Sequence, residues 1–148
     1  MNSVTAEEQD CEFCKIIRGE VKARVVCETG DALAFFPLKP AALGHTLVVP
    51  KQHVRDLWSV DEGLAARVMV LAVRVGKAIK VAVKPEGMQL ISSVGQAATQ
   101  TIFHLHLHMV PRWSNDHIGV IWPPAKLWTE TMKDDVADSI RDACQAPQ

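Results

Sequence analysis

Histidines and apolar residues alternate over residues 104–110, which read HLHLHMV. Successive side chains of a β-strand point to opposite faces, so the alternation predicts a strand over residues 101–110. Leu105, Leu107 and Met109 would then face a core, and the three histidines would share the other face. Alternate side chains on one face lie roughly 7 Å apart. Three imidazoles in this row are therefore close enough to act on one ligand.

The remaining pattern predicts one long helix between two groups of strands. From Asp61 to about Lys84, apolar residues recur at spacings of three and four, which is typical of a helix with one buried stripe. We expect further strands over residues 24–28, 32–36, 45–49 and 88–92, a helical turn over 14–18 and a last helix over 134–143. Strands, then a helix, then strands indicate an α+β domain with an antiparallel sheet. The expected stripe consists of Leu64, Val68, Leu71, Val75 and Ile79.

The length of 148 residues is usual for one domain. The first ten residues are polar and acidic, and we expect a flexible tail over residues 1–10. The single domain would run over residues 11–148. Its C-terminal extension would begin at about residue 113, where the pattern turns irregular.

Charge and composition exclude several classes of protein. The 16 basic and 17 acidic residues give a net charge of -1. The chain therefore lacks the excess of positive charge that would indicate binding to nucleic acid or to an anionic membrane. The N-terminal residues lack the pattern of a signal peptide. No apolar run reaches the roughly 18 residues needed to cross a bilayer. These features favour a cytoplasmic protein.

Three neighbouring imidazoles suit chemistry at phosphorus or carbon. A neutral imidazole is nucleophilic near pH 7, because its reference pKa is about 6.5. A protonated neighbour can stabilise negative charge on phosphoryl oxygens, and a third histidine can orient the nucleophile or hold a metal. Two other interpretations stay open at this point. One is an exposed strand face that carries histidines without function, and the other is a purely structural metal site.

Three separated motifs resemble the histidine-triad (HIT) family. They are HLHLHMV at residues 104–110, GHTLVVPKQH at 44–53 and CEFCKII at 11–17, in the family's order. The neighbouring pairs 100–101 and 111–112 also fit the family. The resemblance points to the zinc-containing bacterial branch. It implies an α+β HIT-like fold, in which an antiparallel sheet carries one long helix and short flanking helices, and it implies a homodimer.

The resemblance also implies catalytic roles. His106, the middle histidine, would be the nucleophile that takes up a nucleotidyl group, and the backbone around it would help to fix its tautomer. His108 would contact the phosphate, and Gln100 would lie near it. The hydroxyl of Thr101 would serve the bridging or leaving atom. His45 and His117 are expected to be structural.

Nucleoside recognition is the part of the pattern in which this sequence departs from the family. Pro37 stands where the family usually has an aspartate that binds ribose hydroxyls, and a proline side chain cannot accept those hydrogen bonds. Ser93 stands where an asparagine is frequent, and it is retained as a candidate nucleotide-binding residue. The other candidates could line an apolar base pocket or belong to an ordinary core, and they are Phe13, Ile16, Phe36 and Leu38.

A Cys-x-x-Cys pair at Cys11 and Cys14 permits three interpretations. The two thiols can be incidental, they can form a redox pair, or they can supply half of a zinc site. Structural zinc prefers four ligands from cysteine and histidine. The family resemblance implies that the set is completed by His53 and His104, with one structural zinc per chain.

The expected function is hydrolysis or transfer at the α-phosphorus of a nucleotide conjugate, through a covalent nucleotidyl-histidine. The candidate substrates are small molecules, namely nucleoside phosphoramidates, aminoacyl adenylates and dinucleoside polyphosphates. Either water or phosphate could accept the nucleotidyl group. The alternative is a catalytically weak nucleotide-binding or scaffold protein that keeps the histidines and the zinc as structure.

Overall fold

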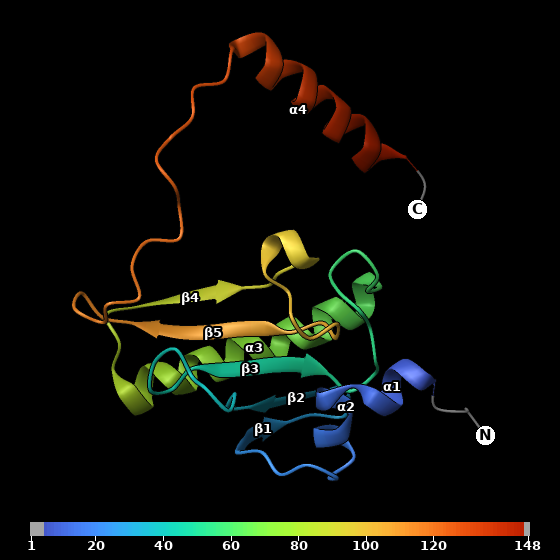
Figure 1. Cartoon of the computed structure of the whole chain (residues 1–148), viewed down its shortest axis with the longest axis vertical. Coiled ribbons are helices and arrows are strands. Elements are labelled where there is room, and N and C mark those ends of the chain that lie inside the picture. Colours follow the sequence, from blue (N-terminus) through green and yellow to red (C-terminus); the bar gives the residue numbers. More distant parts are fainter. Residues whose placement is uncertain (1–4, 147–148) are drawn as a thin grey trace. The chain divides into compact units, whose positions relative to one another are not determined.

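Five antiparallel strands form one sheet in the order β1-β2-β3-β5-β4 (Figure 1). The strands are β1 (Val25–Glu28), β2 (Ala32–Phe35), β3 (Thr46–Pro50), β4 (Gly87–Ile91) and β5 (Leu107–Arg112). The coordinates are a computed structural model, in which residues 5–146 are described. The predicted α+β class and the antiparallel sheet are confirmed.

The long helix α3 (Glu62–Val83) lies between the two groups of strands, as predicted. The Asp61 carboxylate begins it by accepting the N–H of Leu64 at 2.9 Å, which is a favourable N-terminal cap. At the other end, Lys84 adopts a left-handed conformation with φ 48°, and Pro85 follows. All five residues of the predicted stripe are buried. Gly76 lies among them, and there is no room for a larger side chain, because a Cβ at this position would approach Cε of Met88 to 2.8 Å.

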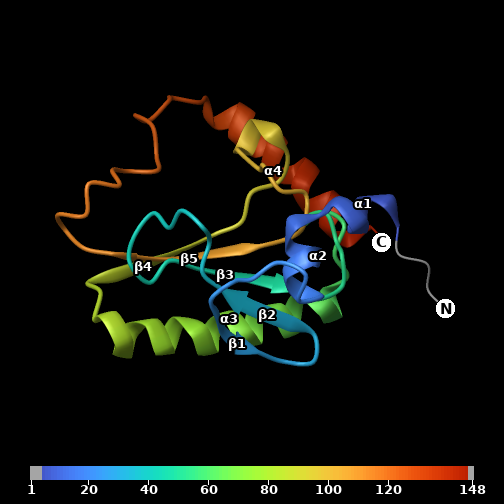
Figure 2. The same ribbon diagram turned by 60° about the horizontal axis from the view of Figure 1, so that its bottom comes forward.

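The two faces of the sheet are covered by different helices (Figure 2). On one face, α3 packs against side chains such as Ala34, Val48 and Met109. On the other face, Phe13 of helix α2 (Glu12–Ile17) packs with Phe35 and its neighbours. Because side chains alternate along each strand, a one-residue shift decides which helix a side chain meets.

Part of the segment expected as a tail is helical. Residues 6–10 form helix α1 (Ala6–Asp10), in which Thr5 and Glu8 make a reciprocal capping box. Such a box satisfies two N–H groups at the start of a helix. Residues 1–4 of the expected tail lie outside the described residues. Helix α2 confirms the predicted helical turn, and Gly19 follows it with φ 76°.

The histidine segment differs from its prediction, because β5 begins only at Leu107. The N–H of Leu105 donates to the carbonyl oxygen of Val54 at 2.6 Å. This bond ties residues 104–105 to the loop after β3, outside the ladder that β5 forms with β3 and β4. A short 3-10 helix, η1 (Gln96–Ala98), precedes the segment. Among the three histidines, only His108 lies on a strand, so the strand predicted over residues 101–110 is too long.

The chain divides into two compact units, residues 1–118 and 119–148. The division falls after the start of the expected extension at about residue 113. Within the second unit, helix α4 (Glu130–Gln145) contains the predicted helix over 134–143, and it begins earlier because the Thr129 hydroxyl accepts the N–H of Met132. No residue of α4 is buried. Across residues 5–146, no helix combines the length and the apolar character that a membrane span requires.

Candidate active site and metal centre

His106 is buried, and one of its ring nitrogens is committed to the backbone. Its Nδ1 lies 2.7 Å from the carbonyl oxygen of His104. A carbonyl oxygen can only accept, so Nδ1 carries the proton and Nε2 keeps its lone pair. The Ser92 hydroxyl donates to the carbonyl oxygen of His106 at 3.1 Å, which fixes the backbone below the ring. His106 therefore has the tautomer that a nucleophile at Nε2 requires.

His108 has the opposite tautomer, because a chain of hydrogen bonds reaches it from the loop before β3. The N–H of Ala41 donates to Nδ1 of His45 at 3.0 Å, so the proton of neutral His45 lies on Nε2. That Nε2 is 3.0 Å from Nδ1 of His108 and donates to it. Neutral His108 then carries its own proton on Nε2. Beside the lone pair of His106, His108 therefore offers an N–H donor, with the two ring centroids 4.8 Å apart.

Burial keeps these three imidazoles neutral. It lowers the pKa of His106, although the carbonyl of His104 acts in the opposite direction. Burial, followed by the charges that His106 and His45 would carry, lowers the pKa of His108 to about 4. The pKa of His45 is also lowered, first by burial and then by His106. Near pH 7 the site therefore combines a neutral nucleophile with a neutral hydrogen-bond donor.

Four sulfur and nitrogen donors converge next to this site. They belong to Cys11, Cys14, His53 and His104, and all four donor atoms lie within 4.8 Å of one another. Sγ of Cys14 is 3.3 Å from Nδ1 of His53. Nδ1 of His104 is 3.4 Å from Sγ of Cys11 and 3.5 Å from Sγ of Cys14. These are the four residues that the family resemblance implied.

The donor set fits a tetrahedral zinc ion. With zinc–sulfur bonds of about 2.3 Å and zinc–nitrogen bonds of about 2.0–2.1 Å, sulfur and nitrogen ligands lie roughly 3.5 Å apart. Nε2 of His104 donates to the carbonyl oxygen of Pro50 at 2.8 Å, which turns the lone pair of Nδ1 toward the two sulfurs. Such an outer hydrogen bond is usual for a metal-binding histidine. Burial, and then Cys11, raise the pKa of the Cys14 thiol to about 12, so two thiolates here need a cation.

Two residues connect the metal centre to His106. His104 contributes its imidazole to the donor cluster and its carbonyl oxygen to Nδ1 of His106. Phe13 lies between the two cysteines in the sequence, and its ring centroid is 5.2 Å from that of His106 and 5.8 Å from that of His104. Both ring pairs meet edge to face. A displacement of the four donor residues would therefore reach His106 directly.

Comparison with known proteins assigns the family. The HIT domain matches residues 18–115. This chain belongs to the HIT family. Adenosine 5'-monophosphoramidase of Schizosaccharomyces pombe is 32% identical over 124 residues, which are 83% of this chain and 90% of the relative. A crystal structure from Streptococcus mutans has a TM-score of 0.88 and 32% identity, and it covers 98% of this chain and 90% of that one.

A third relative supports the zinc-containing branch. It is a zinc-bound histidine triad family protein from Mycobacterium smegmatis, with a TM-score of 0.72 and 29% identity. The similarity covers 93% of this chain and 99% of that one. The HIT-like fold that the resemblance implied is confirmed by these structures.

Gln100 of this HIT-family chain is surrounded by backbone groups. Its amide N–H groups donate to the carbonyl oxygens of Arg55 at 2.9 Å and Ile102 at 3.3 Å. Its Oε1 accepts the N–H of Gly95 at 2.8 Å. The buried amide thus holds the loop from Gly95 to Ile102 against the segment after β3. A position of Gln100 near the phosphate stays a prediction, and the polar atoms of its side chain bond to backbone groups.

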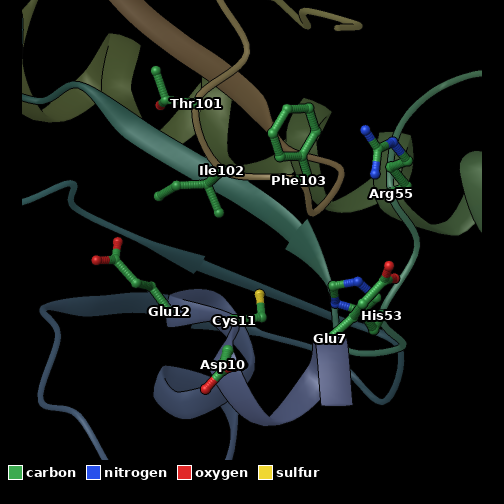
Figure 3. Close-up of a pocket in the computed structure, with 9 residues that line it drawn as sticks. All are labelled: Glu7, Asp10, Cys11, Glu12, His53, Arg55, Thr101, Ile102 and Phe103. Atoms are coloured by element: carbon green, nitrogen blue, oxygen red, sulfur yellow. The ribbon is translucent and has the colours of Figure 1, made fainter. Parts of the chain in front are cut away.

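Thr101 lines a cavity of about 410 Å³, to which Cys11 and His53 of the donor cluster also contribute (Figure 3). Its side chain is exposed. The described hydrogen bonds of residues 5–146 include none between this hydroxyl and His106. The cavity is lined by Glu7, Asp10, Cys11, Glu12, His53, Arg55, Thr101, Ile102 and Phe103.

The candidate base-pocket residues do not form one pocket. Phe13 is buried in the core on the histidine face of the sheet, and Ile16 packs against the same core. Phe36 lies on the opposite face, where it lines a cavity with α3 residues such as Val75. Leu38 is 90% exposed. The assignment of Phe36 to a common pocket with Phe13 is therefore corrected, and that of Leu38 stays a prediction.

Two residues near the candidates take part in the site and were not predicted. Ser92 binds the carbonyl of His106, whereas Ser93 is half-buried and makes no described hydrogen bond in residues 5–146. His45, expected to be structural, donates to His108. The signal for His45 was available in principle. It precedes Leu47 by two residues, so the two share a face, and Leu47 pairs with His108.

Proposed function

We propose that this HIT-family chain transfers or hydrolyses nucleotidyl groups, by attack of His106 on the α-phosphorus of a nucleotide conjugate. The observation that carries the proposal is the pair of opposite tautomers at His106 and His108. One ring presents a lone pair, and its neighbour presents an N–H. Attack at phosphorus requires both, since a nucleophile must approach while negative charge grows on the phosphoryl oxygens.

In the first step, Nε2 of His106 forms a bond to phosphorus while the bond to the leaving group breaks. The leaving atom takes the bonding electron pair and a proton from solvent, and the exposed hydroxyl of Thr101 can donate a hydrogen bond to it. Positive charge develops on the imidazole of His106, and the hydrogen bond from Nδ1 to the carbonyl of His104 stabilises it. Nε2–H of His108 donates to a phosphoryl oxygen.

In the second step, water attacks the same phosphorus. The bond between phosphorus and Nε2 breaks, the electron pair returns to His106, and a nucleoside monophosphate leaves together with a proton. Inorganic phosphate in place of water would give a nucleoside diphosphate, which is the transferase form of the reaction. Both forms use the same covalent intermediate on His106.

Nucleoside phosphoramidates are the first substrates to test. The relative from Schizosaccharomyces pombe is named adenosine 5'-monophosphoramidase, and its similarity to this chain supports the choice. Aminoacyl adenylates and dinucleoside polyphosphates present the same α-phosphorus. Pro37 and the exposed Leu38 support weak recognition of the sugar and base, so we expect tolerance toward different nucleosides.

We further propose one structural zinc per chain, held by Cys11, Cys14, His53 and His104. The donor distances and the zinc-bound relative from Mycobacterium smegmatis support this assignment. When bound, zinc supplies a cross-link between the N-terminal helices and the histidine segment. His106 and His108 lie outside the donor set. The residues proposed to act on phosphorus are therefore separate from those proposed to bind zinc.

The second candidate function is a catalytically weak nucleotide-binding or scaffold protein. Pro37 favours it, because the side chain there cannot bind ribose hydroxyls. Intact-mass spectrometry after brief mixing with nucleoside phosphoramidates, aminoacyl adenylates and dinucleoside polyphosphates separates the two. An enzyme gives an acid-labile nucleotidyl adduct in the wild type and in His117→Asn, which changes an exposed histidine, and none in His106→Ala. Neither an adduct nor released monophosphate from the wild type would favour the scaffold.

We also propose that the chain forms a homodimer through β4 and the adjoining side of α3. β4 is an edge strand, and its Met88 and Leu90 are 41% and 45% exposed. Beside them, Val73 and Gly76 of α3 line an apolar groove of about 300 Å³. Exposed edges of this kind commonly pair with another chain. Light scattering should give a dimer for the wild type and for Val81→Glu, but a monomer for Leu90→Glu.

We place the protein in a reducing compartment such as the cytoplasm. Its four cysteines are unpaired, and two of them belong to the proposed zinc centre. The net charge of -1 supports small-molecule substrates over nucleic acid or an anionic membrane as partners.

A further inference from the structure

The cavity beside the metal centre reaches one of its two sulfurs. Cys11 and His53 line this cavity of about 410 Å³, whereas Cys14 and His104 do not (Figure 3). Cys11 is half-buried, while Cys14 is 5% exposed. A small solute that enters the cavity therefore meets Sγ of Cys11 first. Cysteine reactions are selective in this way, because they follow thiolate character and access.

The second sulfur is placed to complete a reaction that begins at the first. Cys11 is the N-terminal cap of α2, and the N–H of Cys14 points to Sγ of Cys11 at 3.5 Å. The two sulfurs belong to a donor cluster whose atoms all lie within 4.8 Å of one another. A disulfide between residues three apart on one helical turn can therefore close with a local movement. No other element has to separate.

The nucleophile of the active site would sense such a change. Phe13 lies between the two cysteines, and its ring meets that of His106 edge to face at 5.2 Å. His104 faces Sγ of Cys11 at 3.4 Å through its imidazole and accepts from Nδ1 of His106 at 2.7 Å through its carbonyl. Phe13 and His104 therefore each link the cysteine pair to His106.

We propose that Cys11 is a site of reversible oxidation by peroxides, which converts the Cys11–Cys14 pair to a disulfide and expels the zinc. The proposal rests on the zinc centre proposed above. The Cys11 thiolate attacks one peroxide oxygen, so that the O–O bond breaks and a sulfenic acid and hydroxide form. The Cys14 thiolate then attacks Sγ of Cys11, the S–S bond forms, and a second hydroxide leaves. Two protons from solvent complete two water molecules.

The formation of the disulfide is a two-electron oxidation, and it removes two ligands from zinc. Two sulfurs lose one electron each, and one molecule of hydrogen peroxide takes up both. Zinc loses two anionic ligands, keeps only His53 and His104, and leaves to solvent. A dithiol reductant returns both thiolates, after which zinc can bind again. Until then, Phe13 and His104 no longer hold His106 in its nucleophilic arrangement, and adduct formation at His106 falls.

The test uses the full chain loaded with zinc and exposed to hydrogen peroxide. We expect release of one zinc per chain, measured with a metallochromic indicator. Peptide mapping should find a Cys11–Cys14 disulfide, and the intact mass should fall by two hydrogen atoms. Dithiothreitol with added zinc should restore both the metal content and adduct formation. The Cys27→Ser, Cys144→Ser double variant, which keeps only the two cysteines of the metal centre, should behave as the wild type.

Two results would overturn the proposal while leaving the zinc centre and the proposed function intact. One is retention of zinc while Cys27 or Cys144 is oxidised. The other is zinc release without the Cys11–Cys14 disulfide. A chain that carries no zinc before peroxide is added would instead refute the metal assignment, and this inference with it. Adduct formation measured before oxidation reports separately on the proposed activity.

Discussion

Nε2 of His45, just before β3, lies 3.0 Å from Nδ1 of His108 in β5. The contact joins two motifs that are distant in the sequence. Because Nδ1 of His45 accepts the N–H of Ala41, the contact has a direction, and His45 is the donor. His45 is therefore a positioning residue, which sets the tautomer of the histidine proposed to bind the phosphoryl oxygens.

His45→Ala should lower kcat/KM for phosphoramidate hydrolysis by roughly 10–100-fold, a range typical for residues that orient reacting groups. His108 would lose its donor and its neighbouring ring, so its pKa should rise from about 4. The pH at which the His108 ring takes up a proton, followed by NMR, should then move to higher pH. His45→Gln, whose amide can donate to His108, should restore part of the activity. An unchanged titration of His108 together with lower activity would indicate a merely structural role.

The stability of the chain should fall in mild acid because of the same half-buried histidine, His108. Unfolded His108 binds a proton near its ordinary pKa of 6.5, whereas the folded chain binds it only near about 4. Unfolding therefore takes up a proton between these values, and the free energy of unfolding decreases as the pH drops from 6.5 to 4. We expect a decrease on the order of 2 kcal/mol from this half-buried group.

Urea denaturation at several pH values would measure this dependence. His108→Gln should flatten the curve between pH 6.5 and 4, whereas His117→Asn should keep the wild-type slope because His117 is exposed. Equal slopes in all three proteins would show that His108 does not account for the effect.

Gln100→Ala should reduce stability as well as activity. The substitution leaves the carbonyls of Arg55 and Ile102 and the N–H of Gly95 without their partner. Unmaking buried hydrogen bonds costs about 1–3 kcal/mol, and chemical denaturation can resolve a loss of this size. Gln96→Ala, at an exposed position in the same loop, is the matched control. A variant at 100 with full stability and lost turnover would instead support the phosphate-binding role.

Cys14→Ser should abolish stoichiometric zinc and lower Tm on the order of 10 °C, because structural zinc contributes its binding energy to folding. A chelator should reproduce the decrease in the wild type, and added zinc should reverse it there but not in the variant. Cys27→Ser, outside the donor set, should keep the metal. Elemental analysis and calorimetry give the two readouts. Equal Tm values with and without zinc would argue against a structural metal.

Periodicity predicted most of the elements because each depends on local pattern. The stripe of α3 is buried as expected, and the strands before it lie within a residue or so of their predicted bounds. The histidine segment was harder, because the N–H of Leu105 bonds to Val54, far away in the sequence. Alternation in the sequence could not show that a tertiary hydrogen bond replaces the strand ladder there.

The site residues were predicted to different degrees for a related reason. The Cys-x-x-Cys pattern indicated half of the donor set. His53 and His104 were found only through family resemblance, since Cys11 and His104 meet across most of the domain. The choice of Phe36 failed by one position. Phe35 faces α2, and Phe36 faces α3, because parity along a strand decides the face. The backbone partners of Gln100 were not predicted, since nothing local reveals which backbone groups a buried amide will meet.

The hydrogen bonds that distinguish His106 from His108 end on main-chain atoms, the carbonyl of His104 and the N–H of Ala41. The backbone conformation, and not the identity of a third side chain, therefore determines which ring nitrogen carries each proton. Any residue at position 41 that has an amide hydrogen can donate this hydrogen bond to His45. Only proline would remove it. Two imidazoles of the same chemistry, those of His106 and His108, can in this way adopt opposite tautomers without an acidic partner.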